Sequence, residues 1–161
     1  MEEGKPNPPL NRGALLTSVC RALNDGGARY LVIGGYACIL HGYVRTTTDL
    51  DILIERSVEN ARSVLNVLSE VGYGFASEWS PEEILTRPIT LIGDDPAVDL
   101  FTVAWSVKYE FAINRSTTFT IDGVTIPVVG IEDLIESKRT GRVSDAEDIE
   151  ALELLKRSRG G

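Results

Sequence analysis

Hydrophobic residues recur along the chain at two spacings, one typical of amphipathic helices and one typical of strands. The helical spacing, together with glycine stops and capping residues, predicts helices in six segments. These segments cover residues 10–24, 36–42, 58–71, 80–83 and 131–139, and the last one begins at Ser144. The run Ser144-Asp145-Ala146-Glu147 has the capping-box pattern, which predicts that the last helix starts there.

Short β-branched or alternating runs predict the strands between these helices. The runs lie at residues 30–33, 49–54 and 97–101, with an extended segment over 88–92 and two further strands at 117–121 and 124–126. The last two flank Asp122-Gly123, which is a strong signal for a β-hairpin. Because helices and strands interleave, the sequence predicts an α/β (α+β) domain. Its mixed β-sheet is expected to be flanked by helices and to end in a C-terminal helical pair.

The chain has 161 residues, with 43% hydrophobic and 25% charged, which is the composition of one globular domain. We expect this domain to cover residues 10–161, after a flexible tail over residues 1–9. The net charge of −8 argues against broad nucleic-acid binding, because such partners are held by basic faces. No apolar run approaches the roughly 20 residues of a membrane-spanning helix, so no membrane partner is expected.

The few cysteines and histidines narrow the possible chemistry. Cys20 and Cys38 form no C-x-x-C pair and are expected to be reduced core residues of a cytoplasmic protein. His41 is the single histidine, which argues against a Cys/His zinc site and against a Ser-His-Asp nucleophile. Catalysis would then depend on carboxylates, basic residues or a metal ion bound by oxygen.

Carboxylates on two predicted strands are the clearest candidates for such chemistry. Asp49 and Asp51 are two residues apart on one strand, so their side chains point to the same face, about 7 Å apart. Two such carboxylates repel each other unless a cation lies between them, and Mg²⁺ suits a site of a few carboxylates. Asp99 lies in another alternating strand. If the two strands are neighbours, the three acids can hold the two metal ions of an in-line nucleotidyl transfer.

A glycine pair and a lysine complete the candidate site. Gly34-Gly35 follows a predicted buried strand and would let backbone N–H groups approach a phosphate closely. Neither the dinucleotide-binding fingerprint nor the P-loop pattern is present. Lys138 follows Leu134 and Ile135 by four and three residues, so it leaves its helix beside the buried stripe and can reach inward.

The order of these residues resembles a known family, the minimal nucleotidyltransferases of the DNA polymerase β-like superfamily. The likeness covers about residues 29–155 and is greatest to the bacterial toxin–antitoxin branch, the MNT-type and AbiEii-like proteins. The shared motifs are Gly34-Gly35-x-Ala37, His41-Gly42, Arg45-x-Thr47-x-Asp49-x-Asp51, Val98-Asp99-Leu100, Leu134-Ile135-x-x-Lys138 and Gly141-Arg142-x-x-Asp145-x-x-Asp148. This sequence differs from the family pattern at Gly35, where many relatives have serine, and in its shorter C-terminal region.

The resemblance implies an enzyme that moves an NMP, with AMP from ATP favoured, to an acceptor hydroxyl and releases pyrophosphate. The implied acceptor is a protein or an RNA end. Since larger relatives carry an additional helical region, the resemblance also implies a small helical partner protein or a second copy of the chain. A bacterial toxin–antitoxin system is the implied setting.

The resemblance also assigns roles to individual residues. Two Mg²⁺ ions, with Mn²⁺ as an alternative, would be bound by Asp49, Asp51 and Asp99, and Asp99 would help to deprotonate the acceptor. The nucleotide triphosphate would be held by Gly34 and Gly35. Lys138 and Arg142 would face the phosphates or the acceptor, with Lys138 counted among the catalytic residues.

Other interpretations remain open at this point. The chain is alternatively a catalytically silent nucleotidyltransferase-fold antitoxin or a regulatory nucleotide-binding module. His41 is expected to pack at the end of its short helix, and Arg45 to brace the following loop or to pair with an acid near the metals. Asp145 and Asp148 belong to an acidic run that is expected to be mainly a solvated helix face.

Overall fold

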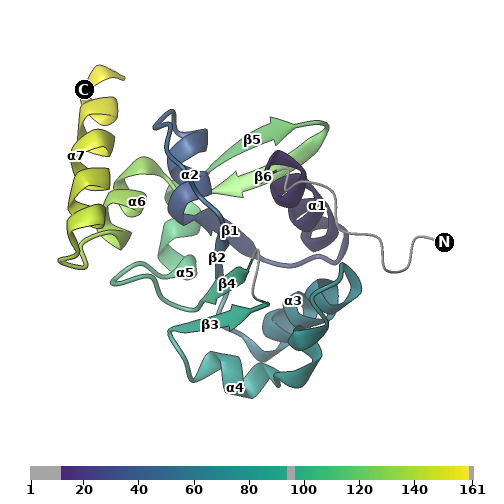
Figure 1. Ribbon diagram of the computed structural model, residues 1–161. Helices are drawn as coiled ribbons and strands as arrows, with labels where there is room; N and C mark the ends of the chain where they lie inside the picture. Colours follow the sequence, from purple (N-terminus) through teal and green to yellow (C-terminus); the bar gives the residue numbers. More distant parts are fainter. Residues whose placement is uncertain (1–11, 94–96, 160–161) are drawn as a thin grey trace.

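A six-stranded mixed β-sheet runs through the middle of the computed structural model, which describes residues 12–93 and 97–159 (Figure 1). The strand order is β3-β4-β2-β1-β6-β5. The strands are β1 (Tyr30–Ile33), β2 (Leu50–Ile54), β3 (Ile89–Ile92), β4 (Val98–Phe101), β5 (Thr117–Ile121) and β6 (Val124–Val128). β2 pairs with β4 and β1 with β6 in parallel, and the other three pairings are antiparallel. The predicted mixed sheet is therefore confirmed.

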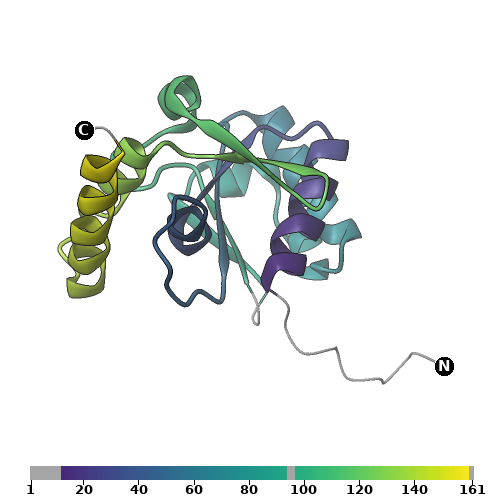
Figure 2. The same cartoon turned by 90° about the horizontal axis from the view of Figure 1, so that it is seen from above.

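Helices cover both faces of this sheet. The α-helices are α1 (Arg12–Asp25), α2 (Gly34–Leu40), α3 (Val58–Glu70), α4 (Pro81–Leu85), α5 (Tyr109–Ala112), α6 (Ile131–Ser137) and α7 (Val143–Ser158). In both views α1 and α3 lie on one side of the strands, and α2, α6 and α7 lie on the other (Figures 1 and 2). Two 3₁₀ helices, η1 (Gly74–Glu78) and η2 (Ile113–Arg115), fill the connections. The described helices include none that is long and apolar enough to span a membrane.

The alternation of residues along β2 determines what the sheet buries and what it presents. Leu50, Ile52 and Ile54 are fully buried on one face. Leu53 is buried on the opposite face, and Asp51 stands beside it on that face, half-buried. The sequence therefore places one carboxylate at an apolar sheet face, next to the start of the strand.

Three structural predictions about turns and buried residues are confirmed. Asp122 and Gly123 both have positive φ, of 50° and 78°, as the two-residue hairpin between β5 and β6 requires. His41 is buried, and its Nε2 donates to the carbonyl oxygen of Val129 at 2.7 Å. Burial lowers the pKa of His41. Cys20 and Cys38 are likewise buried free thiols.

The predicted start of the last helix is wrong. α7 begins at Val143, with Arg142 as its N-cap residue and no side-chain capping bond, so Ser144 starts no capping box. The reason is that Asp145 accepts hydrogen bonds from Thr140 Oγ1 and Arg142 Nε, which fixes the chain before the helix. The pattern also missed α5 and both 3₁₀ helices, which are too short to show a period.

Other boundaries differ by a few residues. β2 begins at Leu50, because Asp49 lies in a bend before the strand. α6 ends at Ser137, so Lys138 is the C-cap residue of that helix. The predicted tail over 1–9 and the predicted helix start at residue 10 lie outside the described residues.

The turn from β1 into α2 packs directly against the loop that precedes β2. Gly34 has φ +68°, which favours glycine, and a Cβ atom there would overlap Asp51 Oδ2. A Cβ atom on Gly35 would overlap both Oγ1 and Cβ of Thr47. Thr47 thus fills the space that a side chain at residue 35 would need.

We predict that Gly35→Ala destabilises the protein by about 1–3 kcal/mol, the usual cost of overpacking, as measured by urea unfolding. Thr47→Gly removes both overlapping atoms, so the double variant should lose less stability than the sum of the single changes. The control is Gly74→Ala, because a Cβ atom there meets nothing within 4 Å. Equal stability of Gly35→Ala and Gly74→Ala would contradict this packing.

Candidate active site

The residues that the sequence singled out surround one cavity of about 360 Å³. It lies at the amino-terminal ends of β2 and β4. All the predicted site residues line it, namely Gly34, Gly35, Asp49, Asp51, Asp99, Lys138 and Arg142. A larger hollow of about 650 Å³ lies at the opposite ends of these strands, with Ile54, Thr102 and Lys108 in its wall, and it contains none of the predicted residues.

The pairing of β2 with β4 places two carboxylates side by side. The parallel register aligns Asp51 with Asp99, so both side chains leave the same face of neighbouring strands. Hydrogen-bonded strands lie about 4.8 Å apart, which is close enough for the two carboxylates to interact. The predicted neighbourhood of the two aspartate-bearing strands is therefore present in the structure.

This carboxylate pair is electrostatically strained. Burial and the adjacent Asp99 raise the pKa of the Asp51 carboxyl to about 8. Burial also raises the pKa of Asp99 above its usual range. Asp99 Oδ1 is buried and has no hydrogen-bond partner among the described residues. Two like charges at low solvent exposure are costly, so a proton or a cation is needed between them.

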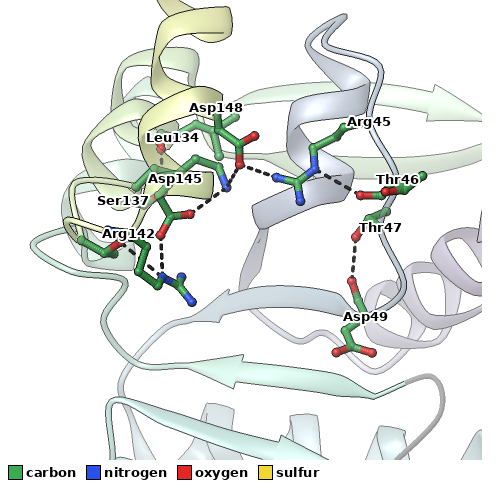
Figure 3. A network of polar contacts seen from close by, with 11 residues as sticks. Arg45, Thr46, Thr47, Asp49, Leu134, Ser137, Arg142, Asp145 and Asp148 are labelled. Carbon is green, nitrogen blue, oxygen red and sulfur yellow. Dashed lines mark hydrogen bonds and ion pairs between the residues drawn. The ribbon is translucent and has the colours of Figure 1, made fainter.

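Asp49 stands at the edge of this pair. Its Oδ1 accepts a hydrogen bond from the Ala97 backbone N–H at 3.2 Å. Its carbonyl oxygen accepts from Thr47 Oγ1 at 3.3 Å (Figure 3). Within residues 12–93 and 97–159, no three His, Cys, Asp or Glu side chains already have the spacing of metal ligands. Two of the three predicted ligands are thus adjacent, and the third is tied to the backbone through one oxygen.

The donor set nevertheless fits a hard divalent cation. All the candidate ligands are carboxylate oxygens, which Mg²⁺ prefers, and one of them is a buried oxygen with no described partner. A cation at this position would take the place of the proton that the Asp51–Asp99 pair retains near neutral pH. The site therefore has the chemistry that a carboxylate-bound metal ion requires.

The opposite wall of the cavity carries positive charge. Lys138 reaches inward, as predicted, and its side chain is only 10% exposed. Lys138 Nζ lies 2.9 Å from Asp148 Oδ2 and 3.8 Å from Asp145 Oδ1. Arg142 Nε lies 2.8 Å from Asp145 Oδ2, while most of the Arg142 side chain is exposed. Figure 3 shows the Arg142 guanidinium on the strand side of α7.

The expectation that Asp145 and Asp148 form a solvated helix face is wrong. Both residues are buried, because they face Lys138 and the neighbouring arginines instead of water. Arg45 Nη1 also donates to Asp148 Oδ2, so Arg45 pairs with an acid on this wall and not with one of the predicted metal ligands. The signal that could have identified these acids is their three-residue spacing, which places both on one face of α7.

The family model for aminoglycoside-2''-adenylyltransferase matches residues 15–152, and no curated protein matches. A nucleotidyltransferase-like antigen from Paracoccidioides brasiliensis is similar in structure, with a TM-score of 0.61, 16% identity and coverage of 90% of this chain and 78% of that one.

Two further solved structures have a similar fold. The lincomycin-bound lincosamide antibiotic adenylyltransferase LnuA has a TM-score of 0.59 and 14% identity, with 92% of this chain and 99% of that one covered. ANT(2")-Ia in complex with adenylyl-2"-tobramycin has a TM-score of 0.56 and 14% identity, with 93% and 99% covered. The predicted nucleotidyltransferase fold is confirmed. The chain therefore belongs to the aminoglycoside-2''-adenylyltransferase family and is an enzyme of the nucleotidyltransferase class.

Proposed function

We propose that the protein is a Mg²⁺-dependent adenylyltransferase that moves AMP from ATP to an acceptor hydroxyl and releases pyrophosphate. The observation that carries the proposal is the aligned pair of Asp51 and Asp99, in which Asp99 Oδ1 is buried without a described partner. This pair faces the cavity that Lys138 and Arg142 also line. Carboxylates on one wall and cations on the other suit a metal–triphosphate complex between them.

In this proposal the two walls of the cavity have different roles. Asp49, Asp51 and Asp99 would hold two Mg²⁺ ions, which when bound neutralise the triphosphate and make the acceptor hydroxyl more acidic. Asp99 accepts the proton of the acceptor hydroxyl as that oxygen bonds to the α-phosphorus and pyrophosphate leaves. The Gly34-Gly35 turn lines the same cavity, and its backbone N–H groups would bind phosphate oxygens.

Lys138 and Arg142 would contact the phosphate groups from the opposite wall. Lys138 carries three N–H donors and Arg142 five, so each has donors beyond those that its carboxylate partners use. Their positive charges offset the negative charge that develops on the departing pyrophosphate. Lys138 is held inward by its burial, whereas Arg142 extends into the cavity from its exposed position.

A small molecule is the acceptor that the comparisons favour. The matching family is named for aminoglycosides, and two structural neighbours hold lincomycin and an adenylylated tobramycin. The second candidate is a protein or RNA acceptor in a toxin–antitoxin system, with a small helical partner or a second copy of the chain. It is favoured by the motif order from Gly34 to Asp148. Buried free thiols are consistent with action in the cytoplasm.

Removal of the Asp99 carboxylate should abolish transfer. We expect Asp99→Asn to lower AMP transfer by about 10²–10⁴-fold, the usual contribution of a general base. The assay supplies labelled ATP and Mg²⁺ with separate aminoglycoside, lincosamide, RNA and cell-protein acceptors, and follows both label and pyrophosphate. Asp25→Asn, an exposed position at the end of α1, is the control.

The outcomes of this assay separate the candidate functions. A labelled antibiotic supports the small-molecule acceptor, and labelled RNA or protein supports the toxin–antitoxin alternative. Nucleotide binding without release of pyrophosphate from ATP, whichever acceptor is supplied, would favour the silent binding module. Equal transfer by wild type and Asp99→Asn would overturn the catalytic proposal.

The raised pKa of Asp51 makes stability depend on pH and metal. Between the ordinary aspartate pKa of 3.8 and about 8, the folded protein keeps a proton that the unfolded chain has lost. The free energy of unfolding without metal should therefore fall as pH rises through this window, and Asp51→Asn should remove that fall. Thermal unfolding with Mg²⁺ should show a stabilisation that grows from about pH 6 to about pH 9 in wild type alone. Identical pH and Mg²⁺ responses in both proteins would contradict the proposed metal site.

A further inference from the structure

Asp148 joins three elements of the fold, one of which, the loop with Arg45, is distant in sequence. Its Oδ2 lies 2.9 Å from Lys138 Nζ and also accepts a hydrogen bond from Arg45 Nη1 (Figure 3). Asp148 lies on α7, Lys138 ends α6, and Arg45 belongs to the loop between α2 and β2. One carboxylate therefore holds a cation from each of the two elements that flank it.

Burial makes this carboxylate necessary to the arrangement. The side chain of Asp148 is 6% exposed, that of Lys138 is 10% exposed and that of Arg45 is 31% exposed. Two cations brought together at such low exposure repel each other strongly unless a negative charge lies between them. Without Asp148, each cation would lower its energy by turning away from the other and toward water.

The network keeps positive charge available for a ligand. Three cations, Arg45, Lys138 and Arg142, share two carboxylates, Asp145 and Asp148, so one net positive charge remains at the cavity wall. Arg45 uses two of its N–H groups on Asp148 and on the Thr46 carbonyl oxygen, out of five that a guanidinium carries. The carboxylates therefore orient the cations without neutralising all of them.

Asp145 and Asp148 pair with different arginines. Asp145 is bound by Arg142 at 2.8 Å and lies farther from Lys138, at 3.8 Å, than Asp148 does. Arg45 pairs with Asp148 alone among the ion pairs of the described residues. The effect of removing Asp148 should therefore fall on Lys138 and Arg45.

We infer that Asp148 is a positioning residue that holds Lys138 and Arg45 together at the cavity wall so that both contact the phosphates of the nucleotide, an inference that rests on the proposed function. Asp148 itself does not touch the substrate in this account. It acts through two cations, one of which, Arg45, thereby becomes an additional nucleotide-contacting residue.

The test compares Asp148→Asn, which keeps the size of the side chain and removes its charge, with Glu150→Gln, an exposed position on the same helix. The first measurement needs no nucleotide. An amine-acylating reagent is followed by mass spectrometry at Lys138, with exposed Lys108 as the internal reference. We expect Lys138 to be labelled several-fold faster in Asp148→Asn and at the wild-type rate in Glu150→Gln.

The second measurement is the KM for ATP beside kcat, with Mg²⁺ present. The KM should rise about tenfold or more in Asp148→Asn, the effect of misplacing one charge-assisted hydrogen bond, with a smaller change in kcat. Asp148→Glu should restore part of the affinity for ATP. Glutamate carries the same negative charge as aspartate, on a side chain that is one methylene longer. If Asp148→Asn does not fold, as judged by circular dichroism, the KM of Asp148→Glu for ATP is the test. A KM above the wild-type value supports the inference, and a wild-type KM overturns it.

Two results would separate this inference from the function on which it rests. If wild type binds ATP and folded Asp148→Asn shows an unchanged KM or unchanged Lys138 labelling, the positioning role is wrong while the proposed function stands. If wild type neither binds nor uses ATP, the proposed function is overturned together with the inference.

Discussion

The structure depends on the repulsion between two carboxylates, those of Asp51 and Asp99, which the strand pairing holds close together. Asp51 and Asp99 are aligned on neighbouring parallel strands, where two carboxylates at low exposure would separate if the backbone allowed it. Backbone hydrogen bonds and buried apolar residues on both strands prevent that separation. The pair instead retains a proton near neutral pH, and a divalent cation is the natural replacement for this proton. Folding energy thus maintains an unfavourable contact at the place where chemistry is proposed.

The surroundings of the pair follow from the same constraint. Gly34 lacks a Cβ atom where one would overlap Asp51, so the β1–α2 turn can lie directly against the acidic pair. On the far wall, buried Asp148 binds Lys138 and Arg45. A cavity between carboxylates and cations can hold a metal–triphosphate complex through complementary contacts on both sides. The cationic wall is required for nucleotide binding, because the carboxylates alone would repel the phosphates.

Sequence patterns predicted the fold well where hydrophobic periods were long. The strands with Asp51 and Asp99 and the helix at α3 were identified from alternation and helical spacing. Short elements such as α5 were missed because four residues cannot establish a period. The start of α7 was assigned to Ser144 because the capping pattern is local, whereas the actual start depends on contacts between Asp145, Thr140 and Arg142.

The candidate site was predictable in part for a related reason. The aspartates on strands were found because their apolar neighbours define which way each side chain points. A charged run on a helix usually faces water, which predicts that Asp145 and Asp148 lie at the surface. Both are instead buried beside Lys138, which is close to them in sequence, and Asp148 also binds Arg45, which only folding brings close. Sequence distance conceals the Arg45–Asp148 pair, whose residues are 103 positions apart.

The most direct test of the central claim is a titration of the Asp51 carboxyl carbon by NMR, with the Asp51→Asn variant used to assign its signal. We predict a pKa of about 8 in the metal-free protein and loss of this titration once Mg²⁺ and a non-hydrolysable ATP analogue are bound. An ordinary aspartate pKa in the metal-free protein, or a titration that Mg²⁺ and nucleotide leave unchanged, would contradict it.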